Sequence, residues 1–471
     1  MNDSTPLSKG HLKRVAAFYD TAAEPSRTAR QYRRILAHYY NLLISPSASV
    51  LEAGCGNGEL LALLNAKDRA GFDLSGKQIE RARQQVPDGR FFVQAGEELA
   101  LDDCFDAIVV SDTLNLAADA QQLLARLRQV AHPKTRLVLN FHNTLWRPLL
   151  NLAARLGLKR REPENSWLAG SDVRNLLDLA GWELIKTSAH ILCPFRCFGI
   201  DVLLNRFAAP LVPWGCLTLF YVARPRPVRE RKPLSTSVLI PARNEAGNIE
   251  EILQRTPPLG PETELIFVEG HSTDDTWGEI QRVAKAYPER NIKILQQPGK
   301  GKGDAVRAGF AVATGDILMI LDADMTMPPE ELPKFYEIIA TNSAEFANGV
   351  RLVYPMEEEA MRFFNLCANK TFSLLFSWLL GQPVKDTLCG TKVMLRTDYE
   401  KLAANRSYFG EFDPFGDFDL LFGANKMNLK FADVPIRYAA RTYGTTNIAR
   451  WRNGVLLLRM VLFAARKLKF V

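Results

Sequence analysis

A short run of uncharged residues that ends in two aspartates constrains this chain more than any other segment. Residues 317–321 read Ile-Leu-Met-Ile-Leu, a run too short for a helix. It predicts a strand that is buried on both faces, as strands inside parallel sheets are. Asp322 and Asp324 follow it directly, at the edge where open α/β sheets bind their ligands. Two carboxylates there predict a site for Mg²⁺ or Mn²⁺, unless they only cap the next element.

Size and composition limit the kinds of protein that this chain can be. With 471 residues it is too long for one ordinary core, so we expect two or three domains. A net charge of +7 falls short of a nucleic-acid-binding footprint, so we expect no nucleic-acid partner. The N-terminus shows no secretory signal, and no stretch approaches the roughly 18 uncharged apolar residues of a membrane span. Seven scattered cysteines fit reduced thiols, and we predict a cytoplasmic protein.

A glycine-rich loop dominates the first half of the chain. A predicted strand at residues 50–53 leads into Gly54-Cys55-Gly56-Asn57-Gly58, a helix should follow, and the next strand ends at Asp73. Glycines let the backbone approach a ligand closely, and an acid about 20 residues further on can hold both hydroxyls of a ribose. The pattern predicts a nucleoside-binding site, with a purely structural turn as the alternative.

Predicted strands at residues 90–93, 105–112 and 136–140 continue the alternation of strands and helices. Residues 15–222 thereby resemble the class I methyltransferases that use S-adenosylmethionine, and the segment Leu51–Gly58 is similar to their first motif. Many relatives carry an aspartate near the adenine where this chain has Glu97, which is our candidate replacement. A dehydrogenase is disfavoured because the third glycine of its fingerprint is missing. The resemblance implies cofactor binding by Glu52, Gly54, Gly56, Gly58, Asp73, Glu97 and Asp112.

Residues 141–222 should supply the side of the site that receives the methyl group. Five residues follow the fourth and fifth predicted strands, where a pocket would open: Asp112, Asn115, His142, Asn143 and Trp146. His142 is either an ordinary polar residue or a general base. The Leu-, Phe- and Pro-rich run from 191 to 222 is either core or a cover over an apolar acceptor, and the sequence leaves both interpretations open.

A proline-rich, basic segment separates the two halves. Residues 223–234 lack apolar periodicity and predict an extended linker, with a segment that binds acidic surfaces as the alternative. We therefore predict a methyltransferase-like domain over residues 1–222 and a second domain over residues 235–471.

Four polar segments of the second half each follow a predicted strand, so we expect them at one edge of a parallel sheet. They are residues 241–245, 269–276, 297–307 and 322–324. Their order over residues 235–445 resembles the family 2 inverting glycosyltransferases of GT-A fold, and among them the dolichol-phosphate-mannose synthase-like enzymes. A nucleotidyltransferase competes, but its glycine- and arginine-rich opening loop is absent. The resemblance implies nucleotide-sugar binding by Pro241, Arg243, Glu245, Glu269, Lys302 and Asp322.

The resemblance also implies a catalytic role for several charged residues. Asp322 and Asp324 would hold Mg²⁺ or Mn²⁺ against the departing diphosphate, with Lys302 and Arg441 as further donors. For Arg441, which lies in a segment similar to the relatives' late arginine loop, the alternative is a surface arginine.

The acceptor decides whether the second domain needs a general base. Asp417 and Asp419 are candidate bases for a hydroxyl acceptor, unless they belong to a solvated acidic loop. A polyprenyl phosphate is already an anion, and Arg351 then becomes important because it resembles an arginine that holds the acceptor phosphate.

The C-terminal run 455–465 is apolar but short, and arginines recur around it every seven residues. Arg452, Arg459 and Arg466 would share one helix face, a pattern that favours a helix in the headgroup plane of a membrane. A packed terminal helix with solvated arginines is the alternative.

The sequence thus predicts an α/β protein with two doubly wound domains, a Rossmann-like fold followed by a GT-A fold. The leading hypothesis is a bifunctional enzyme that transfers a methyl group and, from a nucleotide sugar, a glycosyl group to a polyprenyl phosphate or a glycan. In one alternative the first domain only binds cofactor or acts as a scaffold. In another the second domain binds sugars without turnover.

Overall fold

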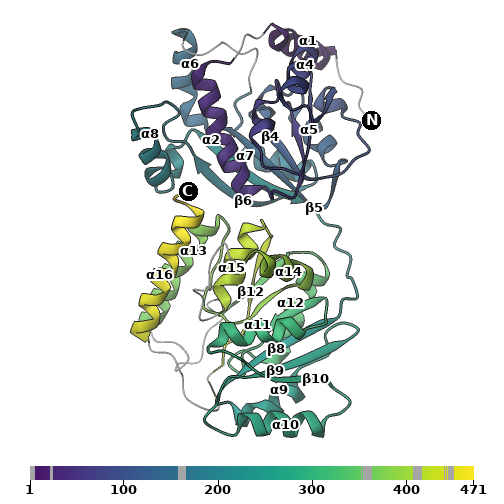
Figure 1. Cartoon of the computed structure of the whole chain (residues 1–471), viewed down its shortest axis with the longest axis vertical. Helices are drawn as coiled ribbons and strands as arrows, with labels where there is room; N and C mark the ends of the chain where they lie inside the picture. The colour runs from purple at the N-terminus through teal and green to yellow at the C-terminus, as the bar shows by residue number, and fades with distance from the viewer. Residues whose placement is uncertain are drawn as a thin grey trace. The chain divides into compact units, whose positions relative to one another are not determined.

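The computed structural model of the chain describes residues 6–21, 25–157, 166–351, 353, 363–406, 416–439, 441, 443 and 450–471. The chain divides into two compact units, residues 1–226 with 469–471, and residues 227–468. Figure 1 shows that each unit has its own sheet flanked by helices. The predicted α/β class with two doubly wound units is therefore confirmed.

The first unit is built on a mixed sheet in the strand order β3-β2-β1-β4-β5-β7-β6. The first five strands in that order run parallel, and β7 is antiparallel to both of its neighbours. The strands are β1 Ser49–Ala53, β2 Asp68–Asp73, β3 Arg90–Val93, β4 Phe105–Ser111, β5 Ala131–His142, β6 Trp182–His190 and β7 Thr218–Pro225. The helices are α1 Pro6–Asp20, α2 Arg27–Leu43, α3 Glu59–Leu63, α4 Gly76–Gln85, α5 Ala120–Leu127, α6 Arg147–Arg155, α7 Gly170–Leu179 and α8 Ile200–Leu203.

Apolar side chains on both faces of this sheet hold its helices. One cluster joins side chains of β1, β4 and β5 to those of α2, α3 and α4, and the other joins them to α5 and α7. Because successive strand residues point to opposite faces, Val50 enters the first cluster and Leu51 the second. The first unit thus has the helix–sheet–helix layers that buried parallel strands require.

Strand β7 extends into the segment that we interpreted as linker. Residues 223–225 pair with β6, with Glu183 opposite Arg224. The Arg224 side chain is only 1% exposed, and its guanidinium bonds the Glu183 carboxylate at 2.8 Å. The arginines and prolines of this segment predicted an extended linker in solvent. Arg224 can nevertheless lie inside the sheet, because the neighbouring antiparallel strand supplies a carboxylate as its partner.

The second unit has a mixed sheet in the order β10-β9-β8-β11-β13-β12-β14. Its first four strands are parallel, β13 is antiparallel to β11 and β12, and β14 is parallel to β12. The strands are β8 Thr236–Ala242, β9 Thr263–Glu269, β10 Asn291–Gln296, β11 Ile317–Ile320, β12 Phe346–Val350, β13 Lys392–Leu395 and β14 Phe431–Pro435. The helices are α9 Ile249–Arg255, α10 Thr276–Ala286, α11 Lys302–Val312, α12 Leu332–Ala340, α13 Phe363–Leu380, α14 Arg396–Ala404, α15 Asp417–Lys426 and α16 Arg450–Leu468.

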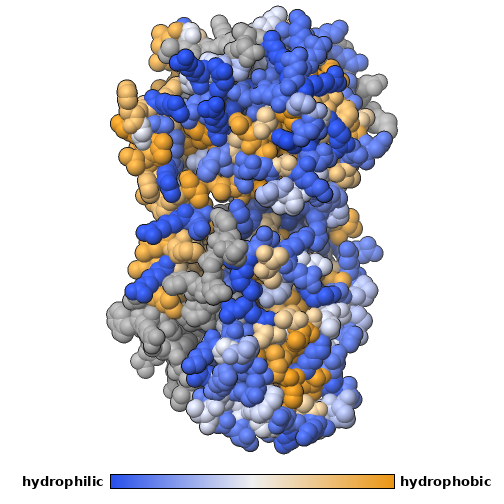
Figure 2. All heavy atoms as spheres, viewed as in Figure 1, coloured by the Kyte–Doolittle hydropathy of each residue, from blue (hydrophilic) through white to orange (hydrophobic). Residues whose placement is uncertain are grey.

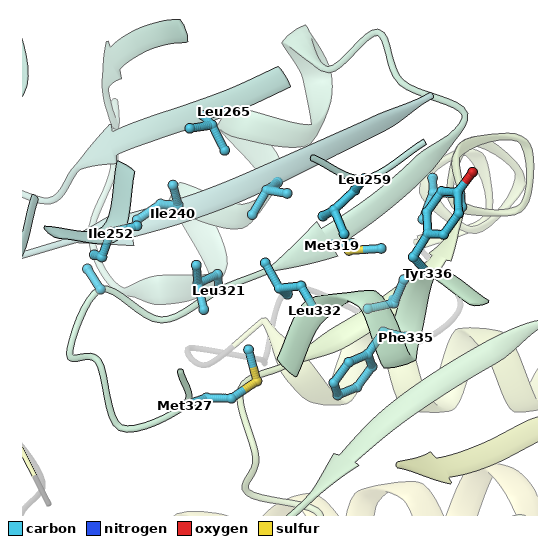
Figure 3. Packing of buried hydrophobic residues seen from close by; sticks show 14 of the residues in the cluster. Ile240, Ile252, Leu259, Leu265, Met319, Leu321, Met327, Leu332, Phe335 and Tyr336 are labelled. Atoms are coloured by element: carbon cyan, nitrogen blue, oxygen red, sulfur yellow. The ribbon is translucent and has the colours of Figure 1, made fainter. Parts of the chain in front are cut away.

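The run that precedes the two aspartates is a fully buried strand, as predicted. Every residue of β11 is buried, and Leu321 after it is buried too. Met319 and Leu321 face a cluster that includes Ile240, Leu332 and Phe335 (Figure 3). This packing fixes where the strand ends and therefore where Asp322 begins.

The C-terminal helix α16 has a mixed exposed face. Leu458 and Leu462 are exposed beside Arg459 and Arg466, while Leu457, Met460, Val461, Ala464 and Ala465 are buried. Leucines and arginines therefore share the exposed face of α16, and the side chain of Arg452 lies outside the described residues. Within the described parts of the chain, no helix has the length and apolarity to cross a membrane.

Candidate functional site

The glycine loop of the first unit leaves room for a ligand above its backbone. Gly54, Gly56 and Gly58 all have positive φ, at 68°, 51° and 75°, a conformation that favours glycine. A Cβ added to Gly54 would come within 2.5 Å of the Thr113 side chain, whereas one added to Gly56 would meet no atom within 4 Å. Gly54 is thus required for packing, while open space lies over Gly56.

Asp73 joins the end of β2 to the glycine loop. Its carboxylate accepts hydrogen bonds from the backbone N–H of Gly56 at 2.9 Å and of Ser75 at 2.9 Å. Burial raises the pKa of Asp73, and these two hydrogen bonds oppose that rise. The sequence-predicted acid therefore lies beside the loop, as a ribose ligand in a βαβ unit requires.

Glu52 lies under the loop as a buried acid. Its side chain is 3% exposed, and its Oε2 has no hydrogen-bond partner among the described residues. Burial raises the pKa of Glu52 to about 8, although Arg33 acts in the opposite direction. Glu97 is also buried, and it holds the start of α5 by accepting from the backbone N–H of Ala118 at 2.7 Å.

Polar side chains gather where β4, β5 and β7 meet. The Asp112 carboxylate accepts from Asn140 Nδ2 at 2.8 Å and from the Tyr32 hydroxyl at 3.1 Å. The Tyr32 oxygen also lies 3.1 Å from Thr218 Oγ1 and 3.5 Å from His142 Nε2. His142 therefore faces polar groups at the predicted acceptor edge, but no pattern in the sequence pointed to Tyr32, Asn140 or Thr218.

In the second unit, the loops after β8, β9 and β10 are bound to one another. Asn244 donates its backbone N–H to Ser272 Oγ at 3.0 Å and accepts from the backbone N–H of Thr273 at 2.7 Å. His271 Nε2 lies 3.0 Å from the Gly299 carbonyl oxygen. These hydrogen bonds confirm the predicted convergence of the polar segments. The segments converge because the carboxyl ends of parallel strands lie at one edge of the sheet.

Lys302 forms the first of two charge clusters at this edge. Its ammonium lies 2.6 Å from Asp322 Oδ1 and 3.6 Å from Asp417 Oδ1. Burial lowers the pKa of Lys302, but the neighbouring carboxylates of Asp322 and Asp417 more than offset it and leave the pKa raised. A Cβ on Gly390 would collide with both the Asp322 carboxylate and the Lys302 ammonium, so a larger residue there would displace this pair.

Arg441 forms the second cluster together with Asp324, which follows Asp322 by two residues in the aspartate motif. It donates to Glu245 Oε1 at 2.8 Å and to Asp324 Oδ2 at 3.0 Å. Burial raises the pKa of Glu245 to about 7, with Arg441 opposing and Asp324 adding to the rise. Asn248, which the sequence did not single out, bridges Glu245 Oε2 and the Ala323 carbonyl oxygen.

The remaining predicted residues lie apart from these two clusters. Glu269 accepts from the Ser272 backbone N–H at 2.5 Å and from Gln296 Nε2 at 3.1 Å. Arg243 is exposed, and Pro241 is half-buried at the end of β8. Asp419 lies 3.8 Å from Arg406.

Arg351 is held by an acid that sequence patterns did not reveal. Its guanidinium makes two hydrogen bonds to the fully buried Asp386, at 2.7 and 2.9 Å, and stacks over Tyr438. Burial raises the pKa of Asp386, but the Arg351 guanidinium more than offsets it and leaves the pKa low. A fork-to-fork pair of this kind fixes the arginine plane.

Two family models match the chain, one in each unit. Residues 27–187 match a methyltransferase domain, and residues 237–402 match glycosyl transferase family 2. The second half is similar to a dolichol-phosphate mannosyltransferase of Pyrococcus furiosus, 34% identical over 139 residues, which are 29% of this chain and 39% of that protein. It is also similar to an undecaprenyl-phosphate 4-deoxy-4-formamido-L-arabinose transferase of Klebsiella pneumoniae, 26% identical over 46% of this chain and 63% of the relative. The chain thus spans less than two thirds of these curated relatives.

Solved structures resemble the two halves more distantly. Magnesium protoporphyrin IX methyltransferase from Synechocystis with bound SAH has a TM-score of 0.33 and 17% identity, over 46% of this chain and 99% of its own. Glucosyl-3-phosphoglycerate synthase from Mycobacterium tuberculosis with Mn²⁺ and UDP has a TM-score of 0.37 and 21% identity, over 50% of this chain and 80% of its own. Both likenesses are too weak to carry an assignment.

The contrast between Gly54 and Gly56 predicts that an alanine at Gly54 destabilises the fold more than an alanine at Gly56. Both Gly54→Ala and Gly56→Ala place a side chain at positive φ, which costs about 1–2 kcal/mol. Gly54→Ala also drives its Cβ into Thr113, whose hydroxyl bonds the Ala53 and Ser111 carbonyl oxygens, and overpacking adds about 1–3 kcal/mol. Calorimetry should show the larger fall in melting temperature for Gly54→Ala. Equal falls would contradict the packing role of Gly54.

The raised pKa of Glu52 predicts a pH-dependent stability of the first unit. An acid with a raised folded-state pKa stabilises the fold fully below its unfolded value of 4.5 and loses that contribution as the pH rises through about 8. Glu52→Gln stays neutral, so its melting temperature should fall less between pH 5 and pH 8 than that of the wild type. The exposed Glu80→Gln is the matched control and should keep the wild-type profile. Identical profiles for all three proteins would show that Glu52 is ionised in the fold.

Proposed function

Because the chain joins a methyltransferase domain to a family 2 glycosyl transferase domain, we propose that it is a bifunctional enzyme. The first domain transfers a methyl group from S-adenosylmethionine. The second transfers a sugar from a nucleotide sugar to a polyprenyl phosphate. The polyprenyl-phosphate acceptor is suggested by the names of the two relatives of the second half. The observation that carries the sugar-transfer proposal is the pairing of Asp322 with Lys302 and of Asp324 with Arg441 at one sheet edge.

The two charge clusters are suited to a nucleoside diphosphate leaving group. Breaking the bond between the sugar and the diphosphate builds negative charge on phosphate oxygens, and cations placed beforehand stabilise it. Lys302 and Arg441 provide two such cations, both partly shielded from solvent. Asp322 and Asp324 hold these side chains in place, so little reorganisation is needed when the diphosphate arrives.

The aspartate pair also fits a divalent cation of the Mg²⁺ or Mn²⁺ type. Among the described residues, no group of three or more His, Cys, Asp or Glu side chains converges on one point. Such ions bind through one or two carboxylates and complete their shell with phosphate oxygens and water, so Asp322 and Asp324 are a sufficient protein contribution. A cation bound there would neutralise charge on the departing diphosphate.

A phosphate acceptor explains why no strong general base is required. The acceptor oxygen is already anionic, so it can attack the anomeric carbon without losing a proton. We propose that Arg351, held by Asp386, binds this phosphate. Asp417 lies beside Lys302 and Asp419 beside Arg406, so both carboxylates already balance cations, and a base role for either would require a hydroxyl acceptor.

We propose that S-adenosylmethionine binds across the glycine loop of the first unit. The open space over Gly56 admits a ligand to the backbone, and Asp73 lies beside it to accept from a ribose. Glu52 lies under the loop, and Glu97 and Asp112 follow β3 and β4 on the same sheet. S-adenosylmethionine when bound supplies an electrophilic methyl group, and the polar cluster of Tyr32, Asp112 and His142 then faces the acceptor.

We further propose peripheral contact of the second unit with a membrane. A polyprenyl phosphate lies in a bilayer, and α16 exposes leucines beside arginines, as a helix in the headgroup plane does. This contact would bring the second unit to its acceptor.

The aspartate motif gives a direct test of sugar transfer. Intact protein is incubated with a panel of nucleotide sugars and polyprenyl phosphate, with Mg²⁺ or Mn²⁺ and then with chelator. Asp322→Asn and Asp324→Asn should lower the rate of release of the nucleotide product by roughly 10²-fold or more, because the charge that holds Lys302, Arg441 and the cation is lost. Glu400→Gln, which alters an exposed pair with Arg396, should retain full activity. Undiminished activity in Asp324→Asn or in chelator would contradict the metal assignment.

Calorimetric titration with S-adenosylmethionine tests the first unit. The wild type should bind the cofactor, and Asp73→Ala should weaken binding about tenfold or more, because a charge-assisted hydrogen bond to the ribose is worth roughly 1.5–3 kcal/mol. Asp88→Ala, at an exposed pair with Arg69, is the matched control. If the folded wild type gives no heat, the first unit is a scaffold.

A further inference from the structure

The first unit exposes many large apolar side chains in two neighbouring segments. They lie in residues 145–156 and 195–214, and each is about half exposed or more. We call these residues the apolar face: Leu145, Leu149, Leu152, Leu156, Phe195, Phe198, Ile200, Val202, Leu203, Phe207, Leu211 and Trp214. Single exposed hydrophobics are ordinary, but a contiguous group marks an interaction site. In Figure 2, apolar atoms gather over the part of the first unit where Figure 1 labels α8.

Helix α6 and the residues at its two ends place leucines on the outside. Leu149 and Leu152 lie in α6, Leu145 lies in the 3-10 turn before it, and Leu156 follows its last residue. Their i, i+4, i+7, i+11 spacing matches one stripe of a helix, and all four are more than half exposed. A different face of the helix packs against the core, through the partly buried Leu150. In the described part of the chain, no segment covers this outward stripe, which an amphipathic helix normally packs against a partner.

The second segment is a long excursion between two paired strands. Strands β6 and β7 are antiparallel neighbours, and a turn of a few residues would be enough to join them. Residues 191–217 instead leave the sheet and return, and Leu217 N–H bonds the Ile191 carbonyl oxygen where they close. The excursion carries Phe195, Phe198 and Trp214 at its surface, the last with 71% of its side chain exposed.

Hydrogen bonds make the two segments parts of one surface. Asn143 Nδ2 donates to the carbonyl oxygens of Trp214 and Cys216 at 2.9 and 3.0 Å. Trp146 Nε1 donates to the Gly215 carbonyl oxygen at 2.9 Å. The beginning of α6 and the end of the excursion are therefore fixed to each other.

The exposed charges within the two segments of the apolar face have one sign. Arg147, Arg155, Arg196 and Arg206 are exposed within residues 143–157 and 191–217. The one acid in these two segments, Asp201, is 6% exposed and accepts from the Cys197 backbone N–H. Apolar and aromatic side chains with an arginine rim match the interface of a bilayer that carries anionic headgroups.

We propose that the apolar face docks the first unit on an anionic lipid bilayer. Trp214, Phe198 and the leucine stripe of α6 enter the boundary between headgroups and acyl chains, while the four arginines contact lipid phosphates. This surface belongs to the methyltransferase unit, whereas α16 belongs to the second unit. The inference requires neither transfer reaction, because it concerns binding to lipid alone.

Co-sedimentation of the full chain with vesicles tests the docking surface. The wild type should bind vesicles of phosphatidylcholine mixed with phosphatidylglycerol, and bind vesicles of phosphatidylcholine alone more weakly. Leu149→Ser with Leu152→Ser, and separately Phe198→Ser with Trp214→Ser, should each weaken binding about tenfold or more, because each pair removes two apolar side chains from the lipid. All four positions are exposed, so circular dichroism and the melting temperature should stay those of the wild type. Arg155→Glu with Arg196→Glu should remove the preference for the anionic lipid.

Trp214 provides a spectroscopic readout of insertion. Vesicles should shift the tryptophan emission of the wild type to shorter wavelength, and Trp214→Phe should reduce that shift while binding persists. The variant Leu458→Ser with Leu462→Ser tests the membrane contact proposed for α16 of the second unit. If the apolar face docks the first unit, this variant should still bind vesicles.

Four results would overturn the proposal. Vesicle binding that is unchanged by both serine pairs, or that is lost only with the α16 pair, would place the lipid contact elsewhere. A wild type that ignores vesicles would also overturn it. So would a wild type that sediments as a dimer and becomes monomeric with the serine pairs without binding vesicles, because the face would then be an interface between two copies.

Discussion

The pairing of two aspartates with two cations at the end of β11 is the interaction on which the second unit depends. Asp322 lies 2.6 Å from Lys302, and Asp324 lies 3.0 Å from Arg441. These four residues come from three distant parts of the chain, and each would be costly to bury alone. Mutual pairing lets them lie partly shielded at one sheet edge. The site that we propose for a diphosphate and a cation would therefore be formed before either ligand arrives.

The scaffold under this site is an uncharged strand. Because β11 and Leu321 are buried on both faces, the strand cannot slip by one residue without turning its apolar side chains from one layer to the other. The register fixes the two aspartates relative to Lys302 at the start of α11. In the first unit the glycine loop is fixed in a similar way: Gly54 packs on Thr113, and the Asp73 carboxylate accepts a hydrogen bond from the backbone N–H of Gly56.

Two buried acids, one in each unit, respond to burial in opposite ways. In the first unit, Glu52 is buried with no ion-pair partner among the described residues, and burial raises its pKa. The second unit pairs its buried acid Asp386 with Arg351, and that arginine leaves the pKa low. The first arrangement favours a neutral acid next to the glycine loop, while the second fixes an arginine in one orientation. Both outcomes follow from the same desolvation penalty, which is met by protonation in one case and by pairing in the other.

Local patterns in the sequence determined the fold class, the two-domain organisation, the glycine loop with Asp73, and the strand that ends in the aspartates, because apolar period and turn chemistry are properties of neighbouring residues. The extent of β7, the partners of Arg351 and Asp112, and the pairing of Arg441 with both Glu245 and Asp324 were decided by tertiary structure alone. Each of these contacts joins residues far apart in the chain, and only packing brings them within a few ångströms. The outward leucine stripe at α6 belongs to the same class: its spacing is visible in the sequence, but only the folded unit shows that the described residues leave it exposed.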